Sequence, residues 1–170
     1  MVKPGYINCV KAVTWGLNGL ALAGLLVAAP LQAQYKQKIG NDMSRCRGAG
    51  PAVSVRVTGI KSGEGTVRAQ IYRATKQDWL ESGRWLYRIE LPAKAGSMTF
   101  CLPVPEPGNF AVAVRHDVNN NDKTDLTQDG GGASNNPAYT IFNLGKPSYT
   151  KTSFPVGKEV KSITINLHYM

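Results

Sequence analysis

The sequence of 170 residues has few acidic residues, few aromatic residues and no long uninterrupted apolar run. It contains 11 Asp plus Glu against 20 Lys plus Arg, and aromatic residues make up 8% of the chain. It has no acidic cluster, nucleotide-binding loop or catalytic-triad signature, so no motif names a reaction. With 18% charged and 42% hydrophobic residues, the chain is not a charge-driven disordered protein. We therefore expect one packed domain.

The N-terminal segment has the pattern of a secretory signal peptide. Two lysines precede a stretch without charge that is rich in Leu and Ala and runs to Pro30. Ala33 is a suitable last residue of the leader, so residues 1–33 are expected to be a cleaved signal peptide. A permanent anchor is the alternative, but the stretch is shorter than the ~20 residues of a spanning helix and contains Asn18. The sequence thus predicts a periplasmic or secreted protein with no stable membrane span.

Cysteine usage agrees with an exported protein. Cys9 lies in the leader, which leaves Cys46 and Cys101 in the mature chain. An even pair in an oxidising compartment favours one disulfide, which would tie an N-terminal arm, residues 34–51, to a strand. Two unpaired buried thiols are the alternative. A metal site is disfavoured, because two cysteines without nearby histidines do not complete a tetrahedral shell.

Residues 52–170 alternate apolar and polar side chains with the period of two that is typical of β-strands. The predicted strands cover residues 52–60, 66–73, 85–91, 97–102, 110–116 and 163–168. Residues 75–82 are expected to form the single short helical turn. The sequence predicts an all-β protein with about seven strands, built as a single antiparallel β-sandwich of the Ig-like or transthyretin-like kind.

The basic residues are spread along the chain rather than gathered in a run. Such diffuse charge favours solubility over a dedicated anionic partner. Nucleic-acid binding would need more aromatic residues among the basic ones than Trp79 and Trp85 provide. We expect a monomer that binds no nucleic acid and whose partner is an unidentified envelope component or protein.

An Asp/Asn-rich loop follows the strand over residues 110–116. Side-chain oxygens occur at relative positions 1, 3, 5 and 9, the spacing of an EF-hand-type calcium loop, with a main-chain carbonyl at position 7. The candidate calcium ligands are Asp117, Asn119, Asn121, Lys123 through its carbonyl, and Asp125. Position 6 is not glycine, position 12 is not glutamate, and no helices are expected to flank the loop. An Asx-rich turn, in which Asn and Asp cap their own backbone, is the alternative.

Two classes of function fit these residues. The first is a binding or envelope-interaction module that uses loops 117–136 at one end of the sandwich. The second is an envelope hydrolase that uses His116 with Asp117 or Asp125. His116 and Asp117 are adjacent in a strand and point to opposite faces. By themselves they therefore cannot form a catalytic pair in which the carboxylate orients the histidine base. We expect binding, with calcium as the only cofactor considered.

The segments AVAVRHDVNNNDKTDL, DGGGASNNP and GKPSYTKTSFPVG, with VSVRVTGIKSGEGTVRAQIYR upstream, carry a family resemblance. Together they resemble the bacterial family called domain of unknown function 2141, over roughly Ala52 to Tyr169. Members usually have glycine in place of Asp122 and an acidic residue near Lys151. The resemblance implies an exported, sandwich-like domain of no established activity.

Overall fold

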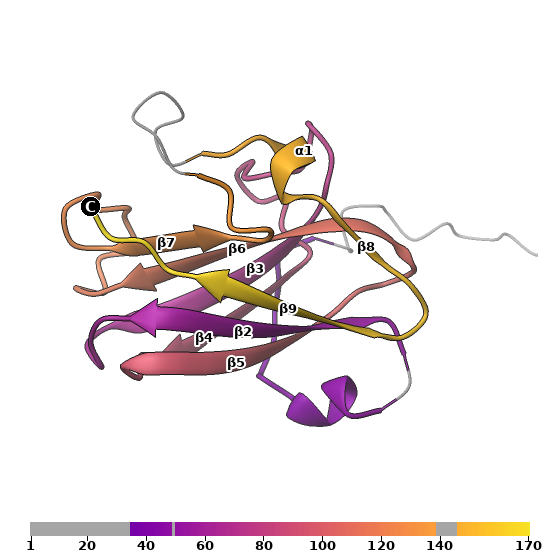
Figure 1. Cartoon of the computed structure of the whole chain (residues 1–170), viewed down its shortest axis with the longest axis horizontal. Helices are drawn as coiled ribbons and strands as arrows, with labels where there is room; N and C mark the ends of the chain where they lie inside the picture. The colour runs from indigo at the N-terminus through magenta and orange to yellow at the C-terminus, as the bar shows by residue number, and fades with distance from the viewer. Residues whose placement is uncertain (1–34, 49, 139–145) are drawn as a thin grey trace, which may run out of the picture.

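The computed structural model describes residues 35–48, 50–138 and 146–170, so the predicted signal peptide lies outside the described residues. Two β-sheets face each other across one apolar core, with little helix (Figure 1). The strands are β1 (Gln37–Lys38), β2 (Ala52–Ile60), β3 (Thr66–Arg73), β4 (Tyr87–Pro92), β5 (Gly96–Pro103), β6 (Gly108–Asp117), β7 (Gly130–Ala133), β8 (Phe154–Val156) and β9 (Val160–Asn166). The larger sheet has the order β1-β4-β3-β6-β7, with β8 also paired to β6, and the smaller sheet has the order β5-β2-β9.

The period-two alternation of the sequence decides which side chains enter the core. Val53, Val55 and Val57 alternate along β2, point toward the larger sheet and are completely buried. They belong to the same core cluster as five fully buried side chains from the larger sheet and β5: Ile71, Ile89, Phe100, Phe110 and Val112. Burial of each large apolar side chain contributes roughly 1.5–3 kcal/mol, so this interface supplies most of the driving force for folding.

The strand pairing is mixed, whereas the sequence predicted an antiparallel sandwich. β2 pairs antiparallel with β5 but parallel with β9, and the short β1 pairs parallel with β4. The antiparallel prediction was wrong because alternation shows which face of a strand is buried but not the direction of its neighbour. Three short strands, β1, β7 and β8, were also not expected.

The described residues contain two short helices that the sequence did not predict. Residues 75–82 form hydrogen-bonded turns rather than a helix: the Trp79 amide donates to the Thr75 carbonyl at 3.0 Å, and Leu80 then takes a φ of 56°. The short helices of the described residues are instead a 3-10 helix, η2 (Met43–Cys46), and one turn of α-helix, α1 (Tyr149–Thr152). The bond to Thr75 makes one helical turn, as predicted, and the left-handed Leu80 stops its propagation into a helix.

The Gly-rich segment after the Asp/Asn-rich loop is the edge strand β7, paired antiparallel with β6. A Cβ atom on Gly132 would lie 2.7 Å from Ile165 Cγ2 and 3.0 Å from the Asn166 carbonyl. Glycine therefore permits the close approach of β7 to β9. This brings the edges of the two sheets together on that side of the molecule.

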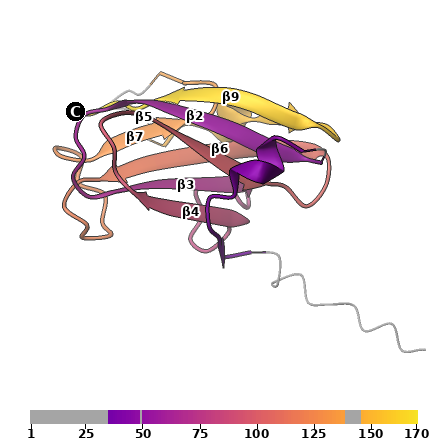
Figure 2. The same ribbon diagram turned by 90° about the horizontal axis from the view of Figure 1, so that it is seen from below.

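The N-terminal arm connects to both sheets (Figure 2). β1 extends the larger sheet at β4. Further along, Cys46 in η2 and Cys101 in β5 form a disulfide with an S–S distance of 2.04 Å. The side chain of Asn41 donates to the Thr99 carbonyl through Nδ2 at 2.9 Å and accepts from the Cys101 backbone amide through Oδ1 at 2.9 Å. It thereby occupies hydrogen-bonding groups at the edge of β5, as a neighbouring strand would. The predicted cysteine pairing is thus present in the structure.

Candidate functional site: a groove beside the Asp/Asn-rich loop

The outer face of the larger sheet carries a second apolar cluster in addition to the main core. Its buried members are Tyr72, Trp79, Trp85, Ala111 and Ala133. The Tyr72 and Trp79 rings meet edge to face with centroids 5.4 Å apart, and the Trp79 indole donates to the Pro147 carbonyl at 2.7 Å. Burial raises the pKa of Tyr72 to about 12. Turn 75–82 is therefore held on this face by aromatic packing.

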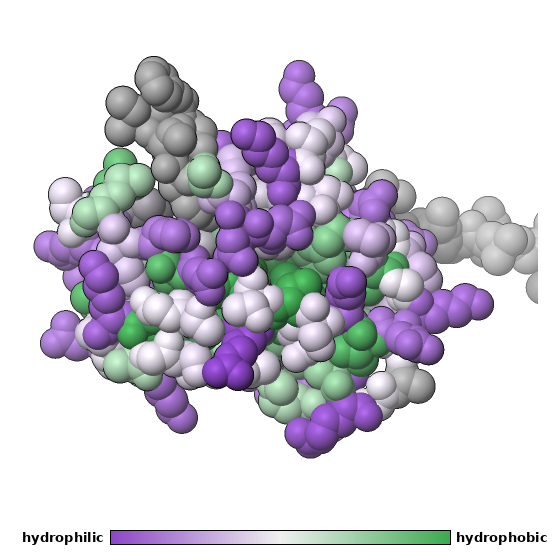
Figure 3. Space-filling model, viewed as in Figure 1, coloured by the Kyte–Doolittle hydropathy of each residue, from purple (hydrophilic) through white to green (hydrophobic). Residues whose placement is uncertain are grey.

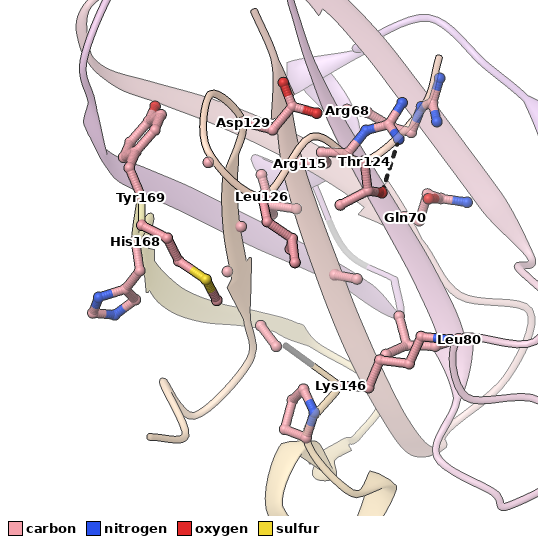
Figure 4. A pocket seen from close by; sticks show the side chains of 18 of the residues that line it. Arg68, Gln70, Leu80, Arg115, Thr124, Leu126, Asp129, Lys146, His168 and Tyr169 are labelled. Carbon is pink, nitrogen blue, oxygen red and sulfur yellow. Dashed lines mark hydrogen bonds between the residues drawn. The ribbon is translucent and has the colours of Figure 1, made fainter. Parts of the chain in front are cut away.

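A groove with a volume of 880 Å³ lies beside this cluster, between β3, β6 and β7 below and loops above. Its lining residues come from separate parts of the chain (Figure 4) and include Arg68, Gln70, Trp79, Leu80, Ala113, Arg115, Thr124, Leu126, Lys146, Pro147 and Met170. The volume falls within the range of small-molecule sites, and the walls are mostly apolar. The described residues thus form a cavity that can hold a ligand.

Two exposed apolar side chains stand at this groove. Leu126 is 49% exposed and Met170 is 68% exposed, and these are the large hydrophobic residues that the described part of the chain exposes. Both line the groove. Single exposed apolar residues are common on protein surfaces, but their concentration at one cavity is typical of a binding site.

One end of the groove is charged. Arg68 and Arg115 face each other across β3 and β6, and Figure 4 shows both side chains at the end away from Leu80. Glu90 accepts from Arg68 Nε at 2.6 Å. Burial opposes ionisation of Glu90, but its bonds from Lys38 and Arg68 outweigh this and lower its pKa. A cationic end and an apolar body therefore share one cavity.

The Asp/Asn-rich loop forms the rim of this charged end. Asp117 accepts from the amide of Asn121 at 3.2 Å through Oδ1, and from the amide of Asp122 at 3.0 Å through Oδ2. Asp122, with a φ of 61°, places its carboxylate on Arg68, and the Arg68 hydrogen bond lowers the Asp122 pKa. The loop is thus an Asx-rich turn that turns back onto the sheet.

The other candidate calcium ligands meet at Asp125. The side-chain amides of Asn119 and Asn121 donate to Asp125 Oδ2 at 2.8 and 2.7 Å, and these bonds lower the Asp125 pKa. The Lys123 amide donates to Asn121 Oδ1 at 2.8 Å. Within the described residues, no group of three or more His, Cys, Asp or Glu side chains is placed to hold a metal ion. The predicted ligand side chains thus lie together in one loop, where they form hydrogen bonds with one another and with the loop backbone.

His116, the residue of the hydrolase alternative, is completely buried. Its Nδ1 lies 2.7 Å from the Tyr169 hydroxyl and its Nε2 lies 2.7 Å from the Glu64 carbonyl. A carbonyl only accepts, so Nε2 carries the proton and Nδ1 accepts from Tyr169. Both ring nitrogens are therefore occupied by Tyr169 and a main-chain carbonyl, and neither has the carboxylate partner that the hydrolase alternative requires.

The sequence Ser134-Asn135-Asn136 after β7 is a structural clamp. Ser134 Oγ donates to the Thr152 carbonyl in α1 at 2.6 Å and accepts from a β6 amide. Asn135 donates to the carbonyl of Lys151 in α1 and to that of Ser153, which directly follows α1. Asn136 bonds two backbone groups of β9 at 3.0 and 2.8 Å. Three consecutive polar side chains thereby join β6, α1 and β9 beside the groove.

Comparison with families of known proteins gives one match, over residues 55–164, to the family described as "Uncharacterized protein conserved in bacteria (DUF2141)". The match covers more than half of the sequence. The chain belongs to the DUF2141 family. No curated protein and no solved structure matches it. In this DUF2141 chain the described residues contain no helix that is long and apolar enough to cross a membrane.

Sequence reasoning singled out the Asp/Asn-rich loop that borders the groove, but it did not identify the groove. Arg68, Trp79 and Met170 had no assigned role in a site, because their distance along the chain hides their proximity. One signal was available: Leu126 is an isolated large apolar residue directly after a run of Asp and Asn. Such a residue in a polar loop indicates either burial or contact with a ligand.

Proposed function

We propose that this DUF2141 chain is an exported binding module whose ligand occupies the groove between turn 75–82, the Asp/Asn-rich loop and the C-terminal residues. The observation that carries the proposal is the groove itself, where an 880 Å³ apolar cavity coincides with the exposed Leu126 and Met170. Ligand sites on β-scaffolds usually lie on loops held by a rigid sheet, as here.

Export is supported by two independent features. The first 33 residues have the pattern of a signal peptide, and the mature part contains the Cys46–Cys101 disulfide. Disulfides persist in oxidising compartments such as the periplasm and the extracellular space. We propose a periplasmic or secreted location, a monomeric state and an envelope component as partner. The two facing open sheets support an Ig-like or transthyretin-like sandwich as the finer description of the fold.

Calcium is proposed as a stabiliser of the rim. The Asn119 and Asn121 amides both point at Asp125 Oδ2. A half-turn of each amide would bring three side-chain oxygens together, an arrangement that is favourable only around a cation. Thermal unfolding with 1 mM calcium or with a chelator tests this, because a ligand of the folded state raises the melting temperature. An increase that is lost in Asp125→Asn supports the site, and an unchanged melting temperature contradicts it.

The binding proposal is tested with the neutral fluorescent dye N-phenyl-1-naphthylamine, which becomes brighter in apolar cavities. We expect saturable binding of the dye that is weakened severalfold in Leu126→Ser and in Met170→Ser, because each substitution removes an apolar side chain from the lining of the groove. Val160→Ser lies outside the groove and serves as the matched control. Circular dichroism confirms that each variant is folded. Binding that is absent, or equally strong in all variants, contradicts the groove as the ligand site.

A further inference from the structure

We infer that the ligand is an amphiphile with one anionic head group, and that Arg68 and Arg115 bind this head group in the position that the Asp122 carboxylate holds in the free protein. The inference rests on the proposed function and specifies the ligand class of the same groove. The head group is a carboxylate or a phosphate, since both accept hydrogen bonds from guanidinium groups. The tail lies along the apolar body of the groove.

The first observation is the opposition of two like charges. Arg68 and Arg115 are direct cross-strand partners in the register of β3 and β6. Their side chains are only 14% and 17% exposed, so water screens them little. Like charges directly opposite each other destabilise a sheet unless anions balance them. The pair therefore requires anionic partners.

The second observation concerns which anions supply that balance: Glu90 lies on Arg68 at 2.6 Å, and the other two belong to the Asp/Asn-rich loop. Asp117 is 5% exposed, accepts from Arg115 at 2.9 Å and also holds loop backbone amides, so it is a fixed part of the structure. Asp122 differs, because its side chain is 83% exposed. It reaches Arg68 directly and lies 4.0 Å from Arg115. A carboxylate with so few other contacts is the one that an incoming anion can displace.

The third observation is an unused donor. Arg115 Nε is buried and has no hydrogen-bond partner, and it is the only such buried side-chain nitrogen or oxygen among the described residues. Buried polar groups without partners cost free energy, and they are rare in folded proteins. Arg115 lines the groove, so a shift of its side chain would expose this donor to an acceptor atom of a ligand.

The fourth observation is the charge of the whole lining. Among the described lining residues, Arg68 and Arg115 contribute two positive charges at one end and Lys146 contributes a third near Leu80, against one side-chain carboxylate, Asp129. Asp129 accepts backbone amides at 3.2 and 3.0 Å through its two oxygens, so it serves the loop rather than a ligand cation. Figure 4 shows the arginines at one end and Leu126 in the middle of the groove. The paired arginines at one end and the apolar walls beyond them match a head group and a tail.

The test measures displacement of N-phenyl-1-naphthylamine from the purified protein by decyl phosphate, decanoate and 1-decanol, all below their micellar concentrations. The three probes each contain ten carbon atoms and differ in the head group, with the tail of decanoate one methylene shorter because its head group includes a carbon. We expect decyl phosphate and decanoate to act at concentrations at least tenfold lower than 1-decanol. A stronger effect of decyl phosphate than of decanoate would identify phosphate as the head group, and the reverse order would identify carboxylate.

Two variants locate the head group. In Arg68→Gln the anionic probes should displace the dye only at the concentrations that 1-decanol needs. Arg56→Gln, the same change on the other sheet, should not alter the displacement. Asp122→Asn removes the competing carboxylate in a residue type that tolerates a positive φ. It should lower the concentration at which the anionic probes displace the dye about three- to fivefold and leave that of 1-decanol unchanged. This variant keeps the inference testable if Arg68→Gln does not fold.

Failure of the inference and failure of the proposed function give different results. If the dye binds but all three probes displace it equally, the anionic ligand class is wrong and the groove remains a binding site. If anionic probes are preferred but Asp122→Asn does not change them, the displacement of Asp122 is wrong. If the dye does not bind at all, both the inference and the proposed function are overturned.

Discussion

The outer faces of the two sheets differ in composition although both sheets cover the same core. The outer face of the smaller sheet carries small polar side chains and Arg56, with Ser54 and Thr58 from β2, Ser97 and Thr99 from β5, and Ser162 and Thr164 from β9. Figure 3 shows this face as pale and purple residues with smaller green areas between them. The outer face of the larger sheet carries aromatic residues, arginines and the groove.

This difference shows how one fold separates stability from binding. A strand with a single apolar face contributes to the core alone, and its other face meets water. The larger sheet uses both faces, because β3 and β6 place apolar residues inward and also support Trp79 and Trp85 outward. The second layer adds stability on the face that forms the groove. The following changes test that division.

Loss of the disulfide should have the largest effect, because it anchors the arm to the smaller sheet. The crosslink between Cys46 and Cys101 spans a sequence separation of 55, and loop-closure entropy assigns it roughly 4 kcal/mol. We expect the double variant Cys46→Ser, Cys101→Ser to lose about that free energy of unfolding in urea denaturation. Reductant should destabilise the parent protein equally and leave the variant unchanged. Equal stability of parent and variant would show that β1 and Asn41 hold the arm by themselves.

The two outer faces can be compared directly by truncating one side chain on each. Trp79→Ala removes the ring that packs on Tyr72 and donates to Pro147, and should cost about 3 kcal/mol. Thr99→Ala on the smaller sheet should change stability by less than ~0.5 kcal/mol, since the side chain is exposed. Chemical denaturation measures both. Similar values for the two variants would contradict the existence of a second stabilising layer.

The edges of the smaller sheet provide a third comparison. Asn41 covers the edge of β5 and Asn136 covers the edge of β9, each through one donated and one accepted bond to backbone. Asn136→Gly retains the positive φ of 47° but removes both bonds, and should cost about 2 kcal/mol. Asn41→Gly should cost less, because the neighbouring disulfide still holds the arm. Equal thermal shifts would show that the disulfide gives β5 no extra protection.

Acid should act mainly on the larger sheet. The pKa values of Glu90, Asp122 and Asp125 are all lowered, through bonds from Arg68 and Lys38 or from asparagine amides, and all three lie on that side. Because each folded-state pKa lies below its unfolded value, their contribution is present above the ordinary values of 3.8 to 4.5 and is lost as the pH falls through the folded pKa values. We expect the melting temperature to fall below about pH 5. The decrease should be smaller in Glu90→Gln than in the parent. An equal decrease would show that Glu90 does not contribute to the loss of stability in acid.

The residues allowed prediction of the strands but not of their arrangement. The alternation over 52–60 and 66–73 gave β2 and β3 with correct bounds, because an apolar core fixes the period of two. β7 was interpreted as a loop, since Gly130 to Gly132 offer no side chains to alternate. The parallel pairing of β2 with β9 leaves no local trace in the sequence.

The candidate site was predictable only in part for a similar reason. The loop from Asp117 to Asp125 is contiguous, so its local Asx pattern is visible in the sequence. The groove depends on side chains from β3, turn 75–82, the loop and the C-terminus. Their proximity follows from sheet order, which hydrophobic periodicity does not encode. Arg68 and Arg115 lie on two adjacent strands, and only the register identifies them as a pair.

The pairing of β2 with β9 has a consequence for the order of folding. β3, β4 and β6 are neighbours through antiparallel pairs that can form while the chain is still being synthesised. β2 reaches one of its two partners only at the end of the chain, and the bond between Thr58 and Asn166 joins residues 108 positions apart. Long-range pairing of this kind makes folding slow. The smaller sheet is therefore completed only after β9 has been synthesised, which leaves one side of the apolar core open to water until then.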